Sequence, residues 1–338
     1  MSRQPRTDAL LVLPRLQIQN ANAITSPLTH GFPAITAFLG LATALERRYA
    51  ASHAVRFGSV GVVCHGYQEL VNDNPFQRSF SLTRNPLTSS GKTAALVEEG
   101  RIHLDISLIF GLQFDDSYGQ AERDKPAFAA EVLDQLQQMR IAGGSVLPSG
   151  RSTRHRPLLE ETPDTAHELR VYIRKLRRRL LPGFALLNGH DILQRQFAAM
   201  CKQDPSASLL DAWLHLSRFN WSTVRDADGQ PVTQNGKTQW AHDRTDGWIV
   251  PIPVGFGALS ELHPPGSVAN ARDPGIHARF VESLYSIGRW VSPHRLTSWE
   301  QLLWYREYDP ENGAYLARNN YQPNRITTDS ELETEIEQ

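Results

Sequence analysis

The chain has 338 residues, of which 40% are hydrophobic and 21% charged, a composition typical of a globular protein and too apolar for a chain that is disordered throughout. Its 35 lysines and arginines nearly balance 36 aspartates and glutamates, so a polyanionic partner would have to be bound by a local basic face rather than by the overall field. Two cysteines exclude a disulfide framework and a four-thiolate zinc site.

The sequence also bears on the compartment. The N-terminal stretch MSRQPRTD lacks the layout of a signal peptide. No run of about 18 apolar residues is present to span a membrane. The low cysteine content fits a reducing environment. We therefore expect a cytoplasmic protein that has no membrane partner.

The first predicted strand covers residues 10–18. Its even positions other than Pro14 are apolar, while its odd positions change from leucine to Arg15, Gln17 and Gln19. This period of two predicts a strand with one buried face and one face that becomes polar halfway along. Pro14 cannot donate to a neighbouring strand, which indicates a bulge or an unpaired position.

A helix is predicted to begin after Pro33 and to end near Tyr49, because its apolar residues recur at three- and four-residue steps. The next predicted elements are two strands, a helix and a short strand, at residues 55–65, 100–111, 124–140 and 142–148. The order strand, helix, strand, strand, helix, strand is that of an α+β, ferredoxin-like domain. In that arrangement both helices cover one side of an antiparallel sheet, and the other side stays available.

We assign this first domain to residues 8–150 and a second, helix-rich region to residues 151–325. The second region is predicted to contain helices, an exposed hairpin or flexible insert, and a strand interrupted by prolines. Helices are expected at 165–181 and 191–200 and two more within 277–305, the insert at 221–248, and the strand at 247–260. Residues 326–338 are acidic, without aromatics, and are expected to form a mobile tail.

The polar half of the first strand is a candidate site. Arg15, Gln17 and Gln19 would project from one strand face, where amides can pair with base edges and an arginine can neutralise a phosphate. A solvated polar strand face is the alternative, and spacing alone leaves it open. Asn20 and Asn22 lie beyond the predicted strand end, where asparagine is also favoured in turns for local reasons.

The loop at residues 82–95 gathers Arg84, Asn85 and Lys92 with several serines and a glycine. This composition suits a loop that grips a nucleic-acid backbone, and it equally suits an ordinary surface turn. The spacing of a phosphate-binding P-loop is absent.

Gly143, Gly144 and Ser145 follow the second predicted helix of the first domain. Gly143 could cap that helix, which is the common role of glycine there. Alternatively, the glycine pair lets a backbone or a ligand approach closely.

The predicted helix at 165–181 carries the strongest concentration of positive charge. Arg170, Arg174 and Arg178 recur every four residues and form one stripe, with Arg177 beside it. Like charges at this spacing repel by a few tenths of a kcal/mol per pair, a cost that an anionic partner would remove. Pairing of the stripe with acidic residues elsewhere in the chain is the alternative.

Candidate catalytic residues are few. His30 or His65 could act as a general base in metal-free RNA cleavage, which makes a ribonuclease the second hypothesis. Metal-ligand spacings and nucleophile motifs are absent, so we expect no metal and no cofactor. A small-molecule enzyme is a third hypothesis without a supporting motif.

Several blocks, in order, together resemble one family over residues 9–306. They are LLVLPRLQIQNANAITSPLTHGFPAITAFLG, SLTRNPLT, ALVEEGRIHLDISLIFGL, MRIAGGSVLP, RRRLLPGFAL, GWIVPIPVGFGALSEL and RFVESLYSIGRWVSPHRL. The family is the Csy-two family, the Cas-five-type subunit of the type I-F (Csy) CRISPR surveillance complex. The acidic tail and the 221–248 insert depart from what we expect of that family.

The resemblance implies a non-catalytic member of the repeat-associated mysterious protein (RAMP) superfamily, with a ferredoxin-like domain and a helical insertion. Such a protein pairs with the large Csy subunit as a heterodimer, abuts the adjacent backbone subunit and holds the 5' handle of the CRISPR RNA (crRNA). Through the complex it lies near the adjacent motif of the target DNA. The cradle for the handle would then combine RLQIQNANAI, TRNP and AGGS, and Arg174, Arg177 and Arg178 are further candidate RNA-binding residues.

Overall fold

The computed structural model describes residues 4–74, 77–84, 87–88, 90–93, 96–115, 124–148, 155–163, 165–244, 247–271 and 273–323. The predicted acidic tail lies outside these residues. Among them, no helix is both long enough and apolar enough to cross a bilayer.

The first part of the chain forms the predicted succession of elements. It consists of β1 (Ala9–Asn22), α1 (Ile35–His53), β4 (Val55–Glu69), β9 (Arg101–Phe114), α2 (Lys125–Gln137) and β11 (Gly144–Val146). This part of the chain also contains short strands. They are β2 (Ile24–Ser26), β3 (Thr29–His30), β5 (Val71–Asp73), β6 (Arg78–Phe80), β7 (Leu82–Arg84), β8 (Leu96–Glu98) and β10 (Arg140–Ile141). The sheet runs β11–β1–β9–β4, and each neighbouring pair is antiparallel.

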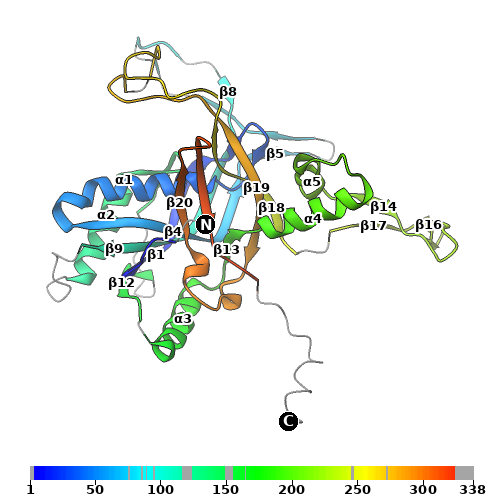
Figure 1. Ribbon diagram of the computed structural model, residues 1–338, viewed down its shortest axis with the longest axis horizontal. Helices are drawn as coiled ribbons and strands as arrows, with labels where there is room; N and C mark the ends of the chain where they lie inside the picture. Colours follow the sequence, from blue (N-terminus) through cyan, green and yellow to red (C-terminus); the bar gives the residue numbers. More distant parts are fainter. Residues whose placement is uncertain are drawn as a thin grey trace.

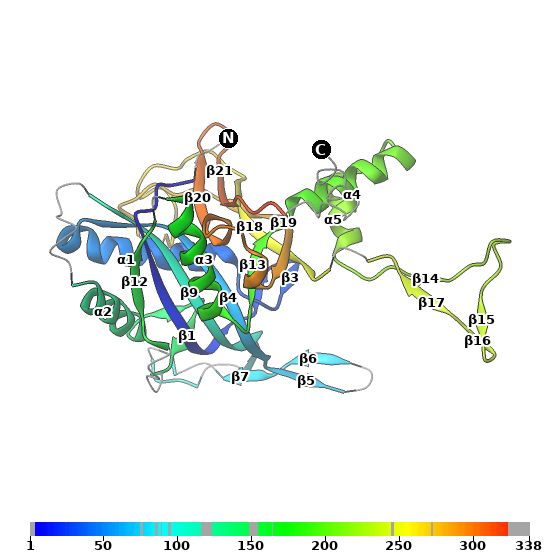
Figure 2. The ribbon, with the colours of Figure 1, turned by 90° about the horizontal axis from the view of Figure 1, so that it is seen from below.

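The two faces of this sheet are covered differently. α1 and α2 pack on one face, over a core that includes Leu11, Leu13 and Phe38. On the opposite face Leu10 and Val12 contact α3 (Ala166–Leu180), which Figure 2 shows lying along the sheet. α3 covers only part of that face, so polar side chains further along β1 stay exposed.

Strands from the second part of the chain extend the same sheet and close it on β4. They are β12 (Leu158–Glu161), β13 (Phe184–Asn188), β18 (Ile249–Ala258), β19 (Val281–Val291), β20 (Trp304–Asp309) and β21 (Ala314–Asn319). The order continues β4–β13–β19–β18–β21–β20, and β20 pairs with β4 again. The outer edge of β4 is therefore shared between β20 at Ser59–Val60 and β13 at Val63–Cys64.

A separate helical unit carries a projecting arm. α4 (His190–Gln203) and α5 (Leu209–Leu216) pack on β18 and β19 through a small core of their own. The arm lies where the sequence predicts an exposed hairpin or flexible insert, and it is a hairpin over residues 221–242. Its strands are β14 (Trp221–Thr223), β15 (Thr233–Gln234), β16 (Lys237–Thr238) and β17 (Trp240–His242). Figures 1 and 2 show it reaching away from the sheet.

The prediction of two helices within residues 277–305 is wrong. This stretch forms β19, two 3-10 turns at Pro293–Arg295 and Glu300–Leu302, and the start of β20. Apolar residues at three- and four-residue steps suggested helix, but pairing with β18 determines the structure. Gly288 shows how tight that packing is, since a Cβ there would lie 2.9 Å from Ile252 Cδ1. α5 and β13 were not predicted.

Trp304 links β20 to the closure of the sheet, because its buried Nε1 donates to the carbonyl of Leu186 on β13 over 2.7 Å. We predict that Trp304→Phe lowers the free energy of unfolding by about 1–3 kcal/mol, since it leaves a buried carbonyl without this donor and a small void. Urea denaturation followed by circular dichroism measures the change. Trp240→Phe, on the exposed arm, should change the free energy of unfolding by less than about 0.5 kcal/mol. If both substitutions lowered it equally, the stabilising role of the Trp304 hydrogen bond would be contradicted.

Candidate nucleic-acid interface

Two β-bulges in β1 decide which side chains face which side of the sheet. Between Leu13 and Leu16, and again between Ile18 and Ala21, β1 has two residues opposite a single residue of β9. The second residue of each bulge, Arg15 or Asn20, has a positive φ, of 56° and 57°. The first bulge confirms the expectation from Pro14, which cannot donate to the ladder.

Each bulge is closed in the same way by a side chain of β9. The backbone N–H of Arg15 donates to Ser107 Oγ over 3.2 Å, and that of Asn20 donates to His103 Nδ1 over 3.1 Å. In both cases the acceptor is the lone residue opposite the bulge. The amide freed by the extra residue is therefore satisfied by a polar side chain of β9, buried in the case of Ser107.

The first bulge changes the predicted facing of the strand. Leu16 and Ile18 join the core under α1 and α2, whereas Leu10 and Val12 lie on the α3 side, so these even positions do not share one face as predicted. One extra residue inverts the alternation of a strand, and a period count through Pro14 misses this. Gln17 and Gln19 consequently lie exposed on the side that α3 leaves uncovered.

Arg15 belongs to a closed polar network rather than to a free cationic surface. Its guanidinium lies 2.9 Å from Asp105 Oδ2. His65 connects the same region, with Nδ1 2.6 Å from the carbonyl of Pro182 and Nε2 2.6 Å from Ser107 Oγ. Because a carbonyl only accepts, Nδ1 carries the proton and Nε2 accepts from the serine. Burial lowers the pKa of His65, against the hydrogen bond to Pro182 and with the charge of Arg15 adding to the effect, so the ring is neutral at neutral pH.

A shallow groove of about 330 Å³ runs over the polar face. Gln17 and Gln19 of β1 line it together with residues of β4 and β9, of which Gln68, His103 and Asp105 are polar. Ser145 of β11 pairs with Gln19 and lies exposed beside it. Neither Gln17 nor Gln19 uses its side-chain amide in a hydrogen bond to any described residue. These two amides can therefore donate to and accept from a ligand.

The remaining residues of the predicted cradle divide between structural roles and a second cleft. Gly144 is required by the fold, since a Cβ there would lie 2.7 Å from Ala21 N and 2.8 Å from Gln19 O. Gly143 does not cap a helix, because α2 ends at Gln137; it lies in the β10–β11 turn with φ of 80°. Asn22 bonds locally to the backbone of Ile24 and, with Gly143, lines a different cleft.

α3 presents the predicted arginine stripe. Ile173, Leu176 and Leu180 are buried against the sheet, and Arg170, Arg174 and Arg178 are exposed. None of these three arginines forms an ion pair with a described residue, which favours an anionic partner over internal pairing. Arg177 is half-buried and its Nε has no hydrogen-bond partner among those residues. The stripe and the groove thus share one side of the sheet.

The predicted loop at 82–95 is only partly described. Asn85 lies outside the described residues, and for Arg84 the structure describes the backbone in β7. Lys92 is exposed next to Gly91, whose φ of 74° permits the turn there. The grouping of these three residues with the groove stays a prediction.

Comparison with known proteins decides the family. A family model described as CRISPR-associated protein (Cas_Csy2) matches residues 11–317. The chain belongs to the Csy2 family. It is similar to the CRISPR-associated protein Csy2 of Pseudomonas aeruginosa (strain UCBPP-PA14), with 42% identity over 314 residues that cover 91% of this chain and 94% of that protein. The resemblance drawn from the sequence blocks is confirmed.

The two histidines of the ribonuclease hypothesis have structural partners in this Csy2-family chain. His65 uses both ring nitrogens in the network around Ser107. His30 is exposed, with Nδ1 3.3 Å from Glu69 Oε1. Within the described part of the chain, no cluster of three or more histidines, cysteines or carboxylates could hold a metal ion.

Sequence reasoning missed part of the groove and all of the aromatic residues near it. His103 and Asp105 alternate with buried residues of β9, a period of two that indicates a polar face but gives no sign of their proximity to Gln17. Phe184 and Trp248 approach β4 through the pairings of β13, β18 and β19. Those pairings join distant parts of the chain and leave no local signal.

The neutral state of His65 makes stability depend on pH. The pKa of His65 is lowered in the folded protein. As the pH falls below about 6.5, the unfolded chain therefore takes up a proton at this histidine more readily than the folded chain does. The free energy of unfolding consequently decreases as the pH is lowered. We predict that the midpoint of urea denaturation decreases less between pH 7.5 and pH 5.5 in His65→Gln than in the wild type.

The decline should not vanish in His65→Gln, because burial also lowers the pKa of His190. His167→Gln, which changes an exposed histidine of α3 outside the network, is the matched control and should keep the wild-type decline. An identical decline in the wild type and in His65→Gln would mean that His65 is not held neutral.

Proposed function

We propose that this chain is the non-catalytic subunit of the type I-F (Csy) CRISPR surveillance complex that binds the 5' handle of the crRNA. The observation that carries the proposal is the side of the sheet that combines the unpaired amides of Gln17 and Gln19 with the unpaired arginines of α3. Amides can pair with unstacked base edges, and arginines neutralise the backbone of a single strand. Membership of the Csy2 family supports this assignment.

The proposal extends to fold and partners. We infer that residues 8–150 form the ferredoxin-like RAMP domain, which the strand order β11–β1–β9–β4 with two helices on one face supports. We further propose a heterodimer with the large Csy subunit, contact with the adjacent backbone subunit, and a place near the target DNA through the complex. A cytoplasmic location fits two unpaired cysteines.

Co-purification of the chain with the products of neighbouring genes, followed by sizing and sequencing of the bound RNA, is the direct test. We expect a uniform guide RNA with an intact 5' repeat fragment, together with a large protein partner. If the chain instead purifies alone and cuts repeat RNA in the presence of EDTA, the ribonuclease hypothesis replaces this one, and His30 and His65 become the residues to substitute.

Removing the free arginines tests the electrostatic part of the interface. For a fluorescent RNA carrying the 5' repeat fragment, Arg174→Gln/Arg178→Gln should weaken binding. It should also flatten the dependence of log K on log salt concentration by about 1.4, because each phosphate contact to a single strand contributes about 0.7. The charge-matched control is Lys202→Gln/Lys237→Gln, on α4 and the arm. An equal change in the control would indicate a nonspecific charge effect.

The amide contacts should behave differently from the charges. Gln17→Ala should weaken binding of the same RNA by about 2- to 12-fold, the value of one hydrogen bond, and leave the salt dependence unchanged. Gln203→Ala, an exposed glutamine at the end of α4, is the control. Unchanged affinity of a folded Gln17→Ala variant would place the base-reading site elsewhere.

A further inference from the structure

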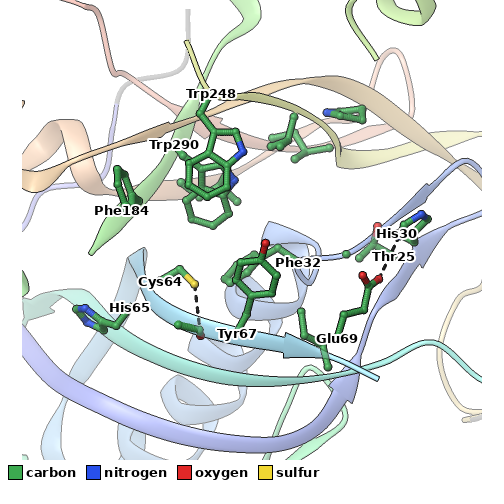
Figure 3. Close-up of a pocket in the computed structure, with 17 residues that line it drawn as sticks. Thr25, His30, Phe32, Cys64, His65, Tyr67, Glu69, Phe184, Trp248 and Trp290 are labelled. Carbon is green, nitrogen blue, oxygen red and sulfur yellow. Dashed lines mark hydrogen bonds and ion pairs between the residues drawn. The ribbon is translucent and has the colours of Figure 1, made fainter. Parts of the chain in front are cut away.

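An aromatic cavity of about 530 Å³, a size within the range of small-molecule sites, lies beside the C-terminal end of β4. Its walls come from the β2–β3 hairpin, β4, β13, β18 and β19. Figure 3 shows Trp248 and Trp290 on one side of the cavity, Tyr67 opposite them, and Phe184 at one end. Glu69, His30 and Thr25 lie at the other end.

Three of these aromatic side chains are strongly exposed. Tyr67 is 61%, Trp248 49% and Phe184 43% exposed. Phe184 meets Trp248 edge to face, with ring centroids 5.4 Å apart, and Trp248 tilts toward Trp290 at 5.9 Å. The rings therefore hold one another in place while their surfaces toward the cavity stay uncovered. Apolar surface concentrated in this way marks a binding site rather than a filled core.

The cavity and the polar groove meet at one point of the fold. Gly66 and Tyr67 line both of them. β13 pairs with β4 only as far as Cys64, so from Gly66 to Glu69 the outer edge of β4 has no partner strand in the described part of the chain. A flexible strand lying over Gln17 and Gln68 has only this uncovered edge to cross before one of its groups reaches the cavity.

One polar wall of the cavity selects for hydrogen-bond donors. Glu69 Oε1 is buried and accepts no hydrogen bond from the described residues, although His30 Nδ1 lies 3.3 Å away. A carboxylate repels phosphate groups and accepts hydrogen bonds from the exocyclic amino groups of nucleobases. The cavity thus offers stacking surfaces and one strong acceptor, a combination that fits a base.

We propose that this cavity receives a single unstacked, amino-bearing nucleobase of the RNA bound in the groove, which stacks on Trp248 and Tyr67 and donates its amino group to Glu69. This inference rests on the proposed RNA-binding function and adds a base-specific pocket to it. The amino-bearing bases are adenine, guanine and cytosine, so uracil at the same position would lack the donor.

A scan of abasic RNAs tests the pocket. In a series of fluorescent RNAs carrying the 5' repeat fragment, each nucleotide in turn loses its base, and affinity for the full chain is measured. One position should show a loss of roughly 5- to 150-fold, the value of one base stacked on aromatic side chains. In Trp248→Ala and in Tyr67→Ala the intact RNA should bind weakly, and removal of that same base should have no further effect.

The controls separate this inference from the proposed function. Trp240→Ala removes a tryptophan on the arm that is more exposed than Trp248, 60% against 49%, and should keep the wild-type abasic profile. If the RNA binds tightly and depends on Gln17, but Trp248→Ala retains the wild-type profile, the pocket is refuted and the handle-binding function stands. If no RNA of the series binds, the proposed function itself fails. A profile without any sensitive base would refute the proposal.

A change of base at the sensitive position tests the contact with Glu69. At the sensitive position, replacement of an amino-bearing base by uracil should weaken binding to the wild type. In Glu69→Gln the two RNAs should bind more nearly alike, because the amide offers one acceptor atom in place of a carboxylate. Arg78→Gln, which removes a neighbour 3.9 Å from Glu69 Oε2 and keeps the carboxylate, is the control and should preserve the discrimination. Equal discrimination in Glu69→Gln would overturn this contact.

Discussion

The register of β1 against β9 is the constraint on which the rest of the structure depends. Two bulges, five residues apart and built alike, each add one residue to β1 and turn its backbone through a positive φ. Without the first bulge, Gln17 and Gln19 would point into the core beneath α1 and α2, and Leu16 and Ile18 would face water. The polar face exists because Arg15 and Asn20 adopt a slightly strained backbone conformation with positive φ.

Different parts of the chain contribute different chemistry to the proposed interface, with the polar groove on the α3 side of the sheet and the aromatic cavity across the uncovered edge of β4. β1 supplies amides, α3 supplies charge, and the ends of β4, β13, β18 and β19 supply aromatic surface. His65 holds these parts together, because one ring nitrogen bonds Ser107 beside the first bulge and the other bonds Pro182 directly after α3. A histidine whose two ring nitrogens are both used within the fold in this way is a structural connector.

Local patterns predicted the first half of the chain well and the second half poorly. Period-two and helical spacings identified β1, α1, β4, β9 and α2, because those elements pack largely against one another and each has one clearly apolar face. β19 is apolar at both strand and helix spacings, so only its pairing with β18 determines its structure. For the site, Gln17, Gln19 and the α3 arginines were visible as polar residues on exposed faces. The aromatic cavity was not, since residues from 25 to 290 must come together to form it.

The shared edge of β4 has a consequence for synthesis of the protein. A ribosome delivers β4 long before β13, and β13 long before β20, yet all three must meet along one strand. During that interval the backbone groups at Ser59–Val60 and Val63–Cys64 lack their final partners, and an uncovered edge of this kind pairs readily with other chains. The nascent polypeptide is therefore most vulnerable to association between the emergence of β4 and that of Trp304, and its last described strands complete the protection of its first.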